Sequence, residues 1–141
     1  MEGRSFYLFT AVQIIVVCGL LWFVFTMPGP WDWQRGLGSA LLVAGLAGVA
    51  AARYQLGRSF AIRAEAHQLV THGIYSKIRN PIYVFGTVMI AGFVLLVHRP
   101  IIWLLVLAVI VMQTIRARRE AQVLEAAFGD AYREYRRHTW F

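Results

Sequence analysis

Charged residues are scarce in this chain, and acidic ones are the rarest. Only 15% of the 141 residues are charged, with seven Asp and Glu residues against fourteen Lys and Arg residues. Apolar residues make up 59% of the sequence, and the mean hydropathy is +0.57. A water-soluble domain of this length cannot cover so much apolar surface, which excludes a purely soluble fold. The composition predicts an integral membrane protein with a single domain.

Cysteine and metal-binding patterns are also nearly absent. The one cysteine, Cys18, has no partner for an intrachain disulfide and is expected to be a buried small hydrophobe. The four histidines form no metal-ligand spacing with one another or with Cys18, so no metal site is predicted. His72 lies in a polar segment where it is able to contact a ligand. The other three are expected to be solvated: His67, His98 and His138.

Long apolar runs are the main feature of the sequence. At 1.5 Å per residue the first run extends roughly 30 Å, enough to cross a bilayer and too long for a secretory signal peptide. The sequence therefore predicts an all-α membrane protein with about four transmembrane helices, followed by an amphipathic helical segment at the C-terminus. The predicted spans cover residues 6–27, 37–55, 82–97 and 101–118.

Small residues recur every four positions in the second predicted span, and this spacing indicates a face on which another helix packs closely. Two glycines in the third span, Gly86 and Gly92, allow a close contact or a bend. The residues of the small-residue face are Ala40, Ala44, Gly48 and Ala52.

The basic residues are distributed unevenly, and their positions predict the topology. Four spans place the N-terminus, residues 53–80 and the C-terminal block on one side, together with twelve of the fourteen Arg and Lys residues. Only Arg35 and Arg99 face the other way. By the positive-inside rule the polar segments and both termini are cytoplasmic, in a multi-pass protein of the inner (plasma) membrane. Topology and anionic lipid headgroups explain the basic residues, so nucleic acid is not an expected partner.

A polar segment before the third span is the first candidate site. Residues 69–83 read LVTHGIYSKIRNPIY. Pro81 suits the first turn of a helix and Asn80 suits its N-cap, and a capped helix start is one complete explanation. The functional alternative is that the N–H groups of this helix start, with Arg79 beside them, bind a carboxylate or phosphate.

A second polar segment follows the fourth span and supplies an acid. Glu120 follows three arginines, and an ion-paired residue at a helix end is the simple explanation. The alternative is that Glu120 accepts hydrogen bonds from ribose hydroxyls or balances a bound cation, with tyrosines such as Tyr132 and Tyr135 supplying aromatic faces. Gly129 suits a helix C-cap, and Asp130 suits the N-cap of a short last helix over residues 131–137. The residues of the expected apolar face before it are Val123, Leu124, Ala127 and Phe128.

The two polar segments together resemble the isoprenylcysteine carboxyl methyltransferase family and its phospholipid N-methyltransferase relatives. The resemblance covers about the C-terminal half of the chain. It departs from the family pattern at Asn80, where histidine is usual, and at Ala121, which replaces the second residue of a glutamate pair. The matching residues of the first segment are Leu69-Val70-Thr71, Gly73, Tyr75, Arg79, Pro81 and Tyr83, and those of the second are Glu120, Leu124, Phe128-Gly129, Tyr132 and Tyr135.

The resemblance implies a single methyltransferase-like domain over residues 1–141, with cofactor-site segments at 67–83 and 116–137. It implies S-adenosylmethionine as cofactor and a lipid-like or prenylated methyl acceptor, with carboxyl O-methylation the favoured reaction. The turn at Gly73–Tyr75 and the helix start at Asn80–Pro81 are expected to present backbone groups to the cofactor. The implied catalytic residues are Arg79, Tyr83 and Glu120, and the implied cofactor-binding residues are His72, Gly73, Ile74, Tyr75, Arg79, Asn80, Pro81, Glu120 and Tyr132.

Two other functions fit parts of the pattern. A small four-helix transporter has the right length, but proton-coupled exporters need an ionisable group within a span, and the apolar centres of the four predicted spans contain no Asp, Glu, Lys or Arg. A non-catalytic assembly or lipid-binding subunit would explain the departures at Asn80 and Ala121. The methyl acceptor and the oligomeric state are left open by the sequence.

Overall fold

A computed structural model describes residues 2–56 and 69–141 of the chain. These residues form helices joined by short turns, with one isolated parallel β-bridge between Ile78 and Trp140, so the all-α prediction is confirmed. Residues 67 and 68 of the predicted segment 67–83, and with them His67, lie outside the described residues. The elements are α1 (Glu2–Thr26), α2 (Trp33–Leu56), the 3₁₀ turn η1 (Gly73–Ser76), α4 (Pro81–Val97), the 3₁₀ turn η2 (Pro100–Ile102), α5 (Trp103–Phe128) and α6 (Asp130–His138).

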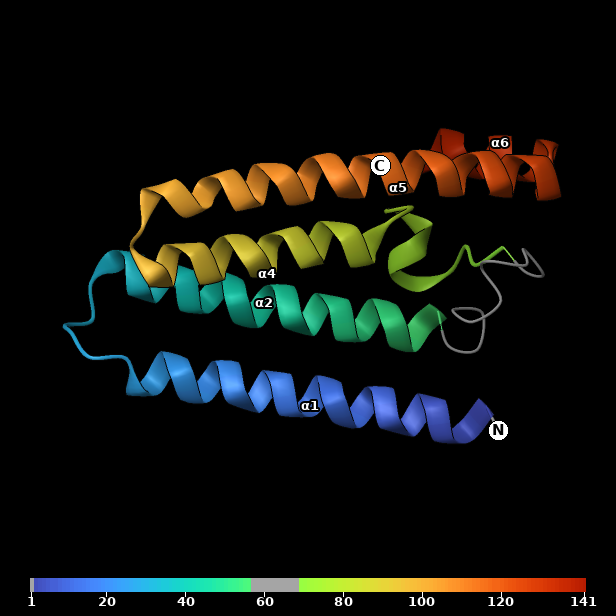
Figure 1. Cartoon of the computed structure of the whole chain (residues 1–141). Helices are drawn as coiled ribbons and strands as arrows, with labels where there is room; N and C mark the ends of the chain where they lie inside the picture. Colours follow the sequence, from blue (N-terminus) through green and yellow to red (C-terminus); the bar gives the residue numbers. More distant parts are fainter. Residues whose placement is uncertain (1, 57–68) are drawn as a thin grey trace.

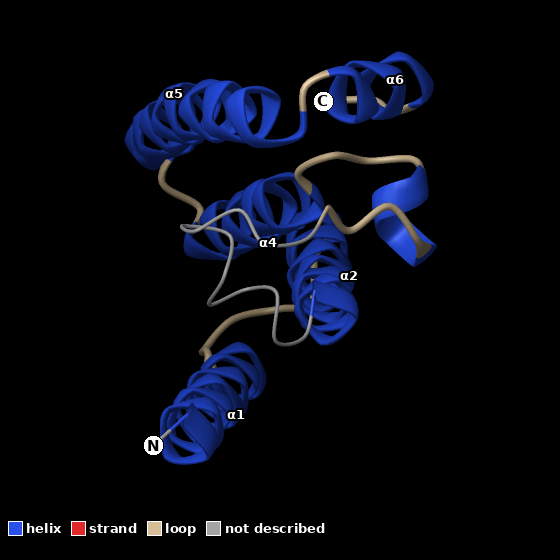
Figure 2. Ribbon diagram, turned by 90° about the vertical axis from the view of Figure 1, so that its right-hand side faces the viewer, coloured by secondary structure: helices blue, strands red, loops and turns tan. Residues whose placement is uncertain are grey.

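The four long helices lie side by side and alternate in direction, so α1, α2, α4 and α5 form an up-and-down arrangement (Figure 1). α6 folds back along the end of α5, and the view along the bundle places these two helices next to each other (Figure 2). The N-terminus, η1, the start of α4 and α6 therefore lie at the same end of the bundle. The convergence of the two polar segments is confirmed.

Within the described residues, two helical segments are long and apolar enough to cross a membrane: α2 and the continuous stretch Pro100–Phe128. Ile14–Thr26 in α1 and the whole of α4 are apolar but shorter. At 17 residues, α4 extends about 26 Å, slightly less than the hydrocarbon core of a bilayer. Large apolar side chains such as Phe25, Leu104 and Met112 are exposed on the outer faces of the bundle, which only an apolar surrounding accommodates.

Glycines bring α2 and α4 into close contact. A Cβ atom on Gly45 would lie 2.5 Å from the backbone nitrogen of Met89, and one on Gly92 would lie 2.5 Å from the backbone nitrogen of Leu42. A Cβ atom on Gly38 would lie 2.8 Å from the carbonyl oxygen of Gly92. The two backbones therefore approach as closely as small residues permit.

The predicted small-residue face of α2 is only half right. Ala52 is buried, but Ala40 and Ala44 are exposed, and the packed face instead runs through Gly38 and Gly45. Each residue turns a helix by about 100°, so a four-residue step drifts by about 40° and a seven-residue step by only about 20° in the opposite sense. Positions 38, 45 and 52 therefore share a face, whereas positions 40 and 52 do not.

α1 packs on the bundle through a narrow stripe. Leu20, Val24 and Met27 contact a core cluster that includes Leu42 of α2 and Leu96 of α4. Cys18 is exposed in α1, and the prediction that it is buried is wrong. It precedes Val24 by six residues, about 240° around the helix, and so faces away from the cluster.

Two details at the end of α5 differ from the prediction: the N-cap of α6 and the apolar face of α5. Gly129 takes a positive φ of 52° and ends α5, as predicted, but Asp130 is the first residue of α6 rather than its N-cap. Of the expected apolar face, only Leu124 is buried and Phe128 is half-buried. Val123 and Ala127 are exposed, because α5 contacts its neighbours on one narrow face here.

Arg35 joins α1 to α2 at the end of the bundle opposite the polar segments. The side chain is buried, and its Nη2 donates to the carbonyl oxygens of Val24 at 2.7 Å and Met27 at 2.9 Å. Its Nη1 donates to the carbonyl oxygen of Gly29 at 2.9 Å. The last carbonyls of a helix have no partner within the helix, so a single guanidinium satisfies the C-terminus of α1 and the turn after it.

His98 links the α1–α2 turn to the α4–α5 turn. It ends α4 with a positive φ of 54°, its Nδ1 lies 2.8 Å from the carbonyl oxygen of Leu96, and its Nε2 lies 3.1 Å from Oδ2 of Asp32. The Leu96 carbonyl and the Asp32 carboxylate raise the pKa of His98. The Arg35 backbone N–H and His98 lower the pKa of Asp32. His98 is exposed, as predicted, but it is also paired.

This pair predicts a pH-dependent stability. Because the pKa of His98 is raised in the folded protein, its protonated ring contributes stability that is complete below its ordinary pKa of 6.5. This stability is lost as the pH rises through the raised pKa. Because the pKa of Asp32 is lowered in the folded protein, its carboxylate contributes stability that is complete above its ordinary pKa of 3.8. This stability is lost as the pH falls through the lowered pKa. We expect His98→Gln to lower the melting temperature most between about pH 4 and 6.5, measured by thermal denaturation in neutral detergent. An equal deficit at pH 5 and pH 9 would contradict this, and His72→Gln at an exposed position is the control.

Candidate functional site

Hydrogen bonds join the two polar segments directly. The Tyr83 hydroxyl, in the first turn of α4, donates to Oε1 of Glu120 on α5. The Tyr135 hydroxyl of α6 donates to the backbone oxygen of Tyr75 in η1 at 2.7 Å. Residues 37 and 60 positions apart in the chain are thus brought together at one end of the bundle.

A further polar contact lies one turn deeper between α4 and α5. The Thr87 hydroxyl lies 2.6 Å from Oε1 of Gln113 and 2.9 Å from the backbone oxygen of Tyr83. The nearest neighbour of a Cβ atom on Gly86 would be Nε2 of Gln113 at 3.6 Å, so this part of the α4–α5 contact is not tight. The two pairs, Tyr83–Glu120 and Thr87–Gln113, set the register of the α4–α5 hairpin.

The end of the chain pairs with the segment before α4. The Trp140 N–H donates to the Lys77 oxygen at 2.7 Å, and the Arg79 N–H donates to the Trp140 oxygen at 3.0 Å. The Asn80 N–H donates to the Phe141 oxygen at 3.0 Å. Asn80 occupies the N-cap position of α4, but its side chain makes no capping hydrogen bond, contrary to the expectation. This pairing holds Phe141 beside the start of α4.

The two segments line an open cavity of about 480 Å³. Ligand pockets are typically a few hundred to about 1,000 Å³, so a small-molecule cofactor fits in this volume. The α5 residues of the wall recur at helical spacing, which places them on one face of that helix. The lining residues are Arg79, Asn80, Thr114, Ala117, Arg118, Ala121, Gln122, Glu125, Tyr132, Arg136 and Phe141.

The cavity reaches from the polar end of the bundle into the apolar layer. Glu125 and Thr114 both line it and are eleven residues apart on α5, a separation of about 16 Å along the axis. Thr114 belongs to the apolar run of α5, and its hydroxyl donates a hydrogen bond to the Ile110 carbonyl oxygen at 2.7 Å. The deep end of the cavity is therefore largely apolar and the shallow end is charged.

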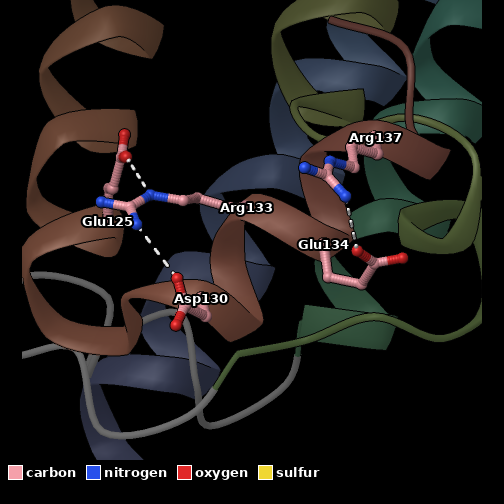
Figure 3. Close-up of polar contacts among 5 residues, drawn as sticks. All are labelled: Glu125, Asp130, Arg133, Glu134 and Arg137. Carbon is pink, nitrogen blue, oxygen red and sulfur yellow. Dashed lines mark hydrogen bonds and ion pairs between the residues drawn. The ribbon is translucent and has the colours of Figure 1, made fainter.

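The charge of the cavity wall is strongly positive. Arg79, Arg118 and Arg136 line it together with a single acid, Glu125. Oε1 of Glu125 lies 2.9 Å from Nε of Arg133, whose Nη1 lies 3.0 Å from Oδ1 of Asp130 (Figure 3). Glu125 is thus already paired, and the wall retains an excess of guanidinium groups. Such a site favours a ligand that carries a carboxylate or phosphate.

The structure places the predicted site residues outside 72–75 in three groups. Arg79, Asn80 and Tyr132 line the cavity. Pro81 is fully buried at the start of α4. Glu120 and Tyr83 do not line the cavity, but Glu120 lies on α5 between two residues that do, Ala117 and Ala121.

The η1 turn serves the fold rather than the cavity wall. The Ile74 N–H donates to Oε1 of Gln55 on α2 at 2.7 Å, and the Tyr75 N–H donates to the His72 oxygen at 3.1 Å. Tyr75 is buried against Ala52 and Leu56 of α2, whereas His72 and Gly73 are exposed. The N–H groups of Ile74 and Tyr75 are therefore used internally, and the expectation that this turn presents backbone groups to a cofactor stays a prediction.

The sequence did not point to most of the α5 wall. Arg118, Gln122 and Glu125 follow Thr114 at steps of three or four residues, and Arg136 follows Tyr132 by four, which is the spacing of one helix face. That periodicity was available in the sequence. Phe141 reaches the wall only through its backbone pairing with Asn80, for which no sequence signal exists.

Comparison with known proteins identifies the family of the chain. No curated protein and no solved structure shows significant similarity to it. The family model for phospholipid methyltransferases matches residues 33–131, which include α2, α4, α5 and the first two residues of α6. The match covers well over half of the chain and agrees with the resemblance of the two polar segments to membrane methyltransferases. The chain belongs to the phospholipid methyltransferase family of membrane methyltransferases.

Proposed function

We propose that this protein transfers a methyl group from S-adenosylmethionine to a lipid-like acceptor inside the cavity between α4, α5 and α6. The observation that carries the proposal is the cavity itself, whose wall is built from the two segments that resemble the methyltransferase family. It is charged at its polar end and apolar at its deep end. A polar cofactor and an acceptor with an apolar chain require both kinds of wall.

The residues of the polar end match the chemical groups of the cofactor. The Arg79 guanidinium suits its carboxylate, and the ring of Tyr132 offers an aromatic face to its cationic or adenine part. Glu120 supplies a negative charge near the wall. When bound, S-adenosylmethionine supplies a methyl group activated by a positive sulfonium. The chain needs only to align the two reactants and provide a suitable electrostatic setting.

The Tyr83–Glu120 pair joins α4 to α5, the helix that carries most of the wall. The Tyr83 hydroxyl holds the Glu120 carboxylate, and with it the stretch of α5 that contains Ala117 and Ala121. We propose that Glu120 balances positive charge in the cavity and that the polar head of the acceptor lies near Tyr83. Ala121 leaves room on the wall where related carboxyl methyltransferases carry a second glutamate.

The acceptor is proposed to enter from the bilayer with an anionic oxygen in its head. Thr114 and Ala117 form the deep part of the wall, next to the apolar surface of α5. A soluble acceptor would not require a cavity that reaches this depth. Arginines on the wall favour a carboxylate over a protonated amine, so carboxyl O-methylation is the reaction that fits best.

The cavity is proposed to open on the cytoplasmic side of the plasma membrane. S-adenosylmethionine is made in the cytosol, and the excess of basic residues lies at the cavity end of the chain. With alternating helices, both termini lie on that side in a multi-pass arrangement (Figure 1).

Glu120→Gln tests the cofactor site. We expect the affinity for S-adenosylhomocysteine, measured by calorimetric titration of the purified protein, to fall by about tenfold or more because a charged partner is lost. The matched control is Glu134→Gln, which removes an exposed α6 carboxylate whose ion pairs, within the described part of the chain, are with Arg137 and His138. Incubation with methyl-labelled cofactor and a host lipid extract then identifies the acceptor. Absence of cofactor binding in the folded wild-type protein would overturn the proposal.

A further inference from the structure

Two arginines on the cavity wall have no part in the hydrogen bonds that build it. Arg118 on α5 and Arg136 on α6 both line the cavity. Among the residues that the structure describes, neither guanidinium makes an ion pair, and the one acid of the wall, Glu125, is engaged by Arg133. Two positive groups that face one cavity repel each other, and an anion between them relieves that repulsion.

The Arg133–Glu125 ion pair fixes how the two helices face each other. It joins α6 to α5 near the turn at Gly129. α6 folds back along α5 (Figure 1), Arg136 follows Arg133 by three residues on α6, and Arg118 precedes Glu125 by seven residues on α5, so both arginines lie farther from the Gly129 turn than this ion pair in sequence. The placement of the two arginines is therefore set by the packing of α6 on α5.

The depth of Arg118 indicates what kind of anion would bind. It follows the apolar run of α5 by three residues, counted from Ile115, so it lies where a membrane-spanning helix passes into the headgroup layer. Below it the wall consists of Ala117 and Thr114, which offer apolar contact. A ligand held at this level has its oxyanion beside the arginines and an alkyl chain along the deep end.

We propose that Arg118 and Arg136 form a binding site for the oxyanion head of a lipid, a phosphate or carboxylate on an alkyl chain. The proposal deepens the proposed function and rests on it for the identification of this lipid as the methyl acceptor. In this proposal Arg79, which precedes α4, binds the cofactor. The two arginines are therefore specificity-determining residues that select acceptors with an anionic head over cationic or neutral ones.

Binding of dodecyl phosphate to the full-length protein in neutral maltoside detergent tests the site without any cofactor. We expect dodecyl phosphate to bind, and inorganic phosphate and dodecyltrimethylammonium to bind about tenfold more weakly or not at all. Equal binding of inorganic phosphate would assign the arginines to a soluble anion and overturn the lipid assignment.

The double variant Arg118→Gln, Arg136→Gln should bind dodecyl phosphate at least about tenfold more weakly. The matched control is Arg116→Gln, Arg119→Gln, which removes the same charge from exposed positions of α5 that do not line the cavity and should bind as the wild type does. Unchanged binding to the first variant, or an equal loss in the control, would overturn the site.

Titration of the same variants with S-adenosylhomocysteine separates this inference from the proposed function. We expect the Arg118, Arg136 double variant to keep its affinity for S-adenosylhomocysteine within about threefold, since the cofactor contacts Arg79 in this proposal. A parallel loss of affinity would show that these arginines hold the cofactor and would overturn their assignment to the acceptor. If dodecyl phosphate binds as expected while S-adenosylhomocysteine does not bind to any form, the lipid site stands and the proposed function fails.

Discussion

Replacing Gly45 by alanine is expected to destabilise the protein by about 2 to 3 kcal/mol, because the new methyl group has no space between α2 and α4. Its Cβ would lie 2.5 Å from the backbone nitrogen of Met89 and 2.7 Å from both the Cα of Met89 and the carbonyl oxygen of Phe85. These are main-chain atoms, so no side-chain rotation relieves the clash. The two helices have to move apart, and every contact along their shared face weakens.

Gly36 is the matched control for this substitution. It lies in the same helix, and a Cβ atom there meets nothing within 4 Å. Gly36→Ala should leave the stability unchanged or raise it by about 0.5 to 1 kcal/mol, because alanine loses less backbone entropy in a helix than glycine does. Melting temperatures in one detergent compare the two variants. A Gly45→Ala protein as stable as Gly36→Ala would show that α2 and α4 are not in close contact.

Arg35→Met is expected to destabilise the protein by about 3 kcal/mol or more. The buried guanidinium donates to the carbonyl oxygens of Val24, Met27 and Gly29 and stacks 4.5 Å from the centre of the Trp31 ring. Methionine keeps much of the apolar stem but leaves these carbonyls at the end of α1 without a donor. Unsatisfied buried polar groups cost about 1 to 3 kcal/mol each, and loss of the cation–π contact adds to this.

Arg99→Met is the control for charge at this end of the bundle, because Arg99 is exposed in the α4–α5 turn. It should change the melting temperature little. Hydrogen exchange should show that Arg35→Met releases the C-terminal half of α1 first, since Leu20, Val24 and Met27 are its contacts with the core. The cavity lies at the other end of the bundle, so binding of S-adenosylhomocysteine at low temperature should persist. A loss of that binding with α1 still docked would contradict this separation.

Much of the architecture could be predicted because it depends on local properties of the chain. Apolar runs of helical length predicted an all-α membrane protein, and Pro81 and Gly129 marked a helix start and a helix end. An even number of alternating helices brings both polar segments to one end, which is why residues 53–80 and the C-terminal block were expected on the same side. Among the residues that the structure describes, α2 and Pro100–Phe128 are long and apolar enough to cross a membrane, so length supports two of the four predicted spans.

The packing face of α2 shows where this kind of prediction fails. A four-residue spacing of small residues suggested one face, and the chain uses another, through Gly38, Gly45 and Ala52. Small residues are common on lipid-facing helices as well, so size alone does not identify the face that meets a neighbour. Gly92 of α4 helps to select the face, because its missing side chain lets the backbone of α2 at Gly38 and Leu42 approach closely.

The sequence by itself determined the membrane class, the helices and the family, because composition, helix termini and motif spacing are properties of short stretches of chain. The tertiary structure alone decided which side chains share the cavity. It assigned Ile74 and Tyr75 to internal hydrogen bonds, placed Arg118 and Arg136 on one wall, and brought Phe141 to Asn80. These placements depend on how α4, α5 and α6 pack, and packing depends on contacts between residues that are far apart in the chain and carry no local signal of one another.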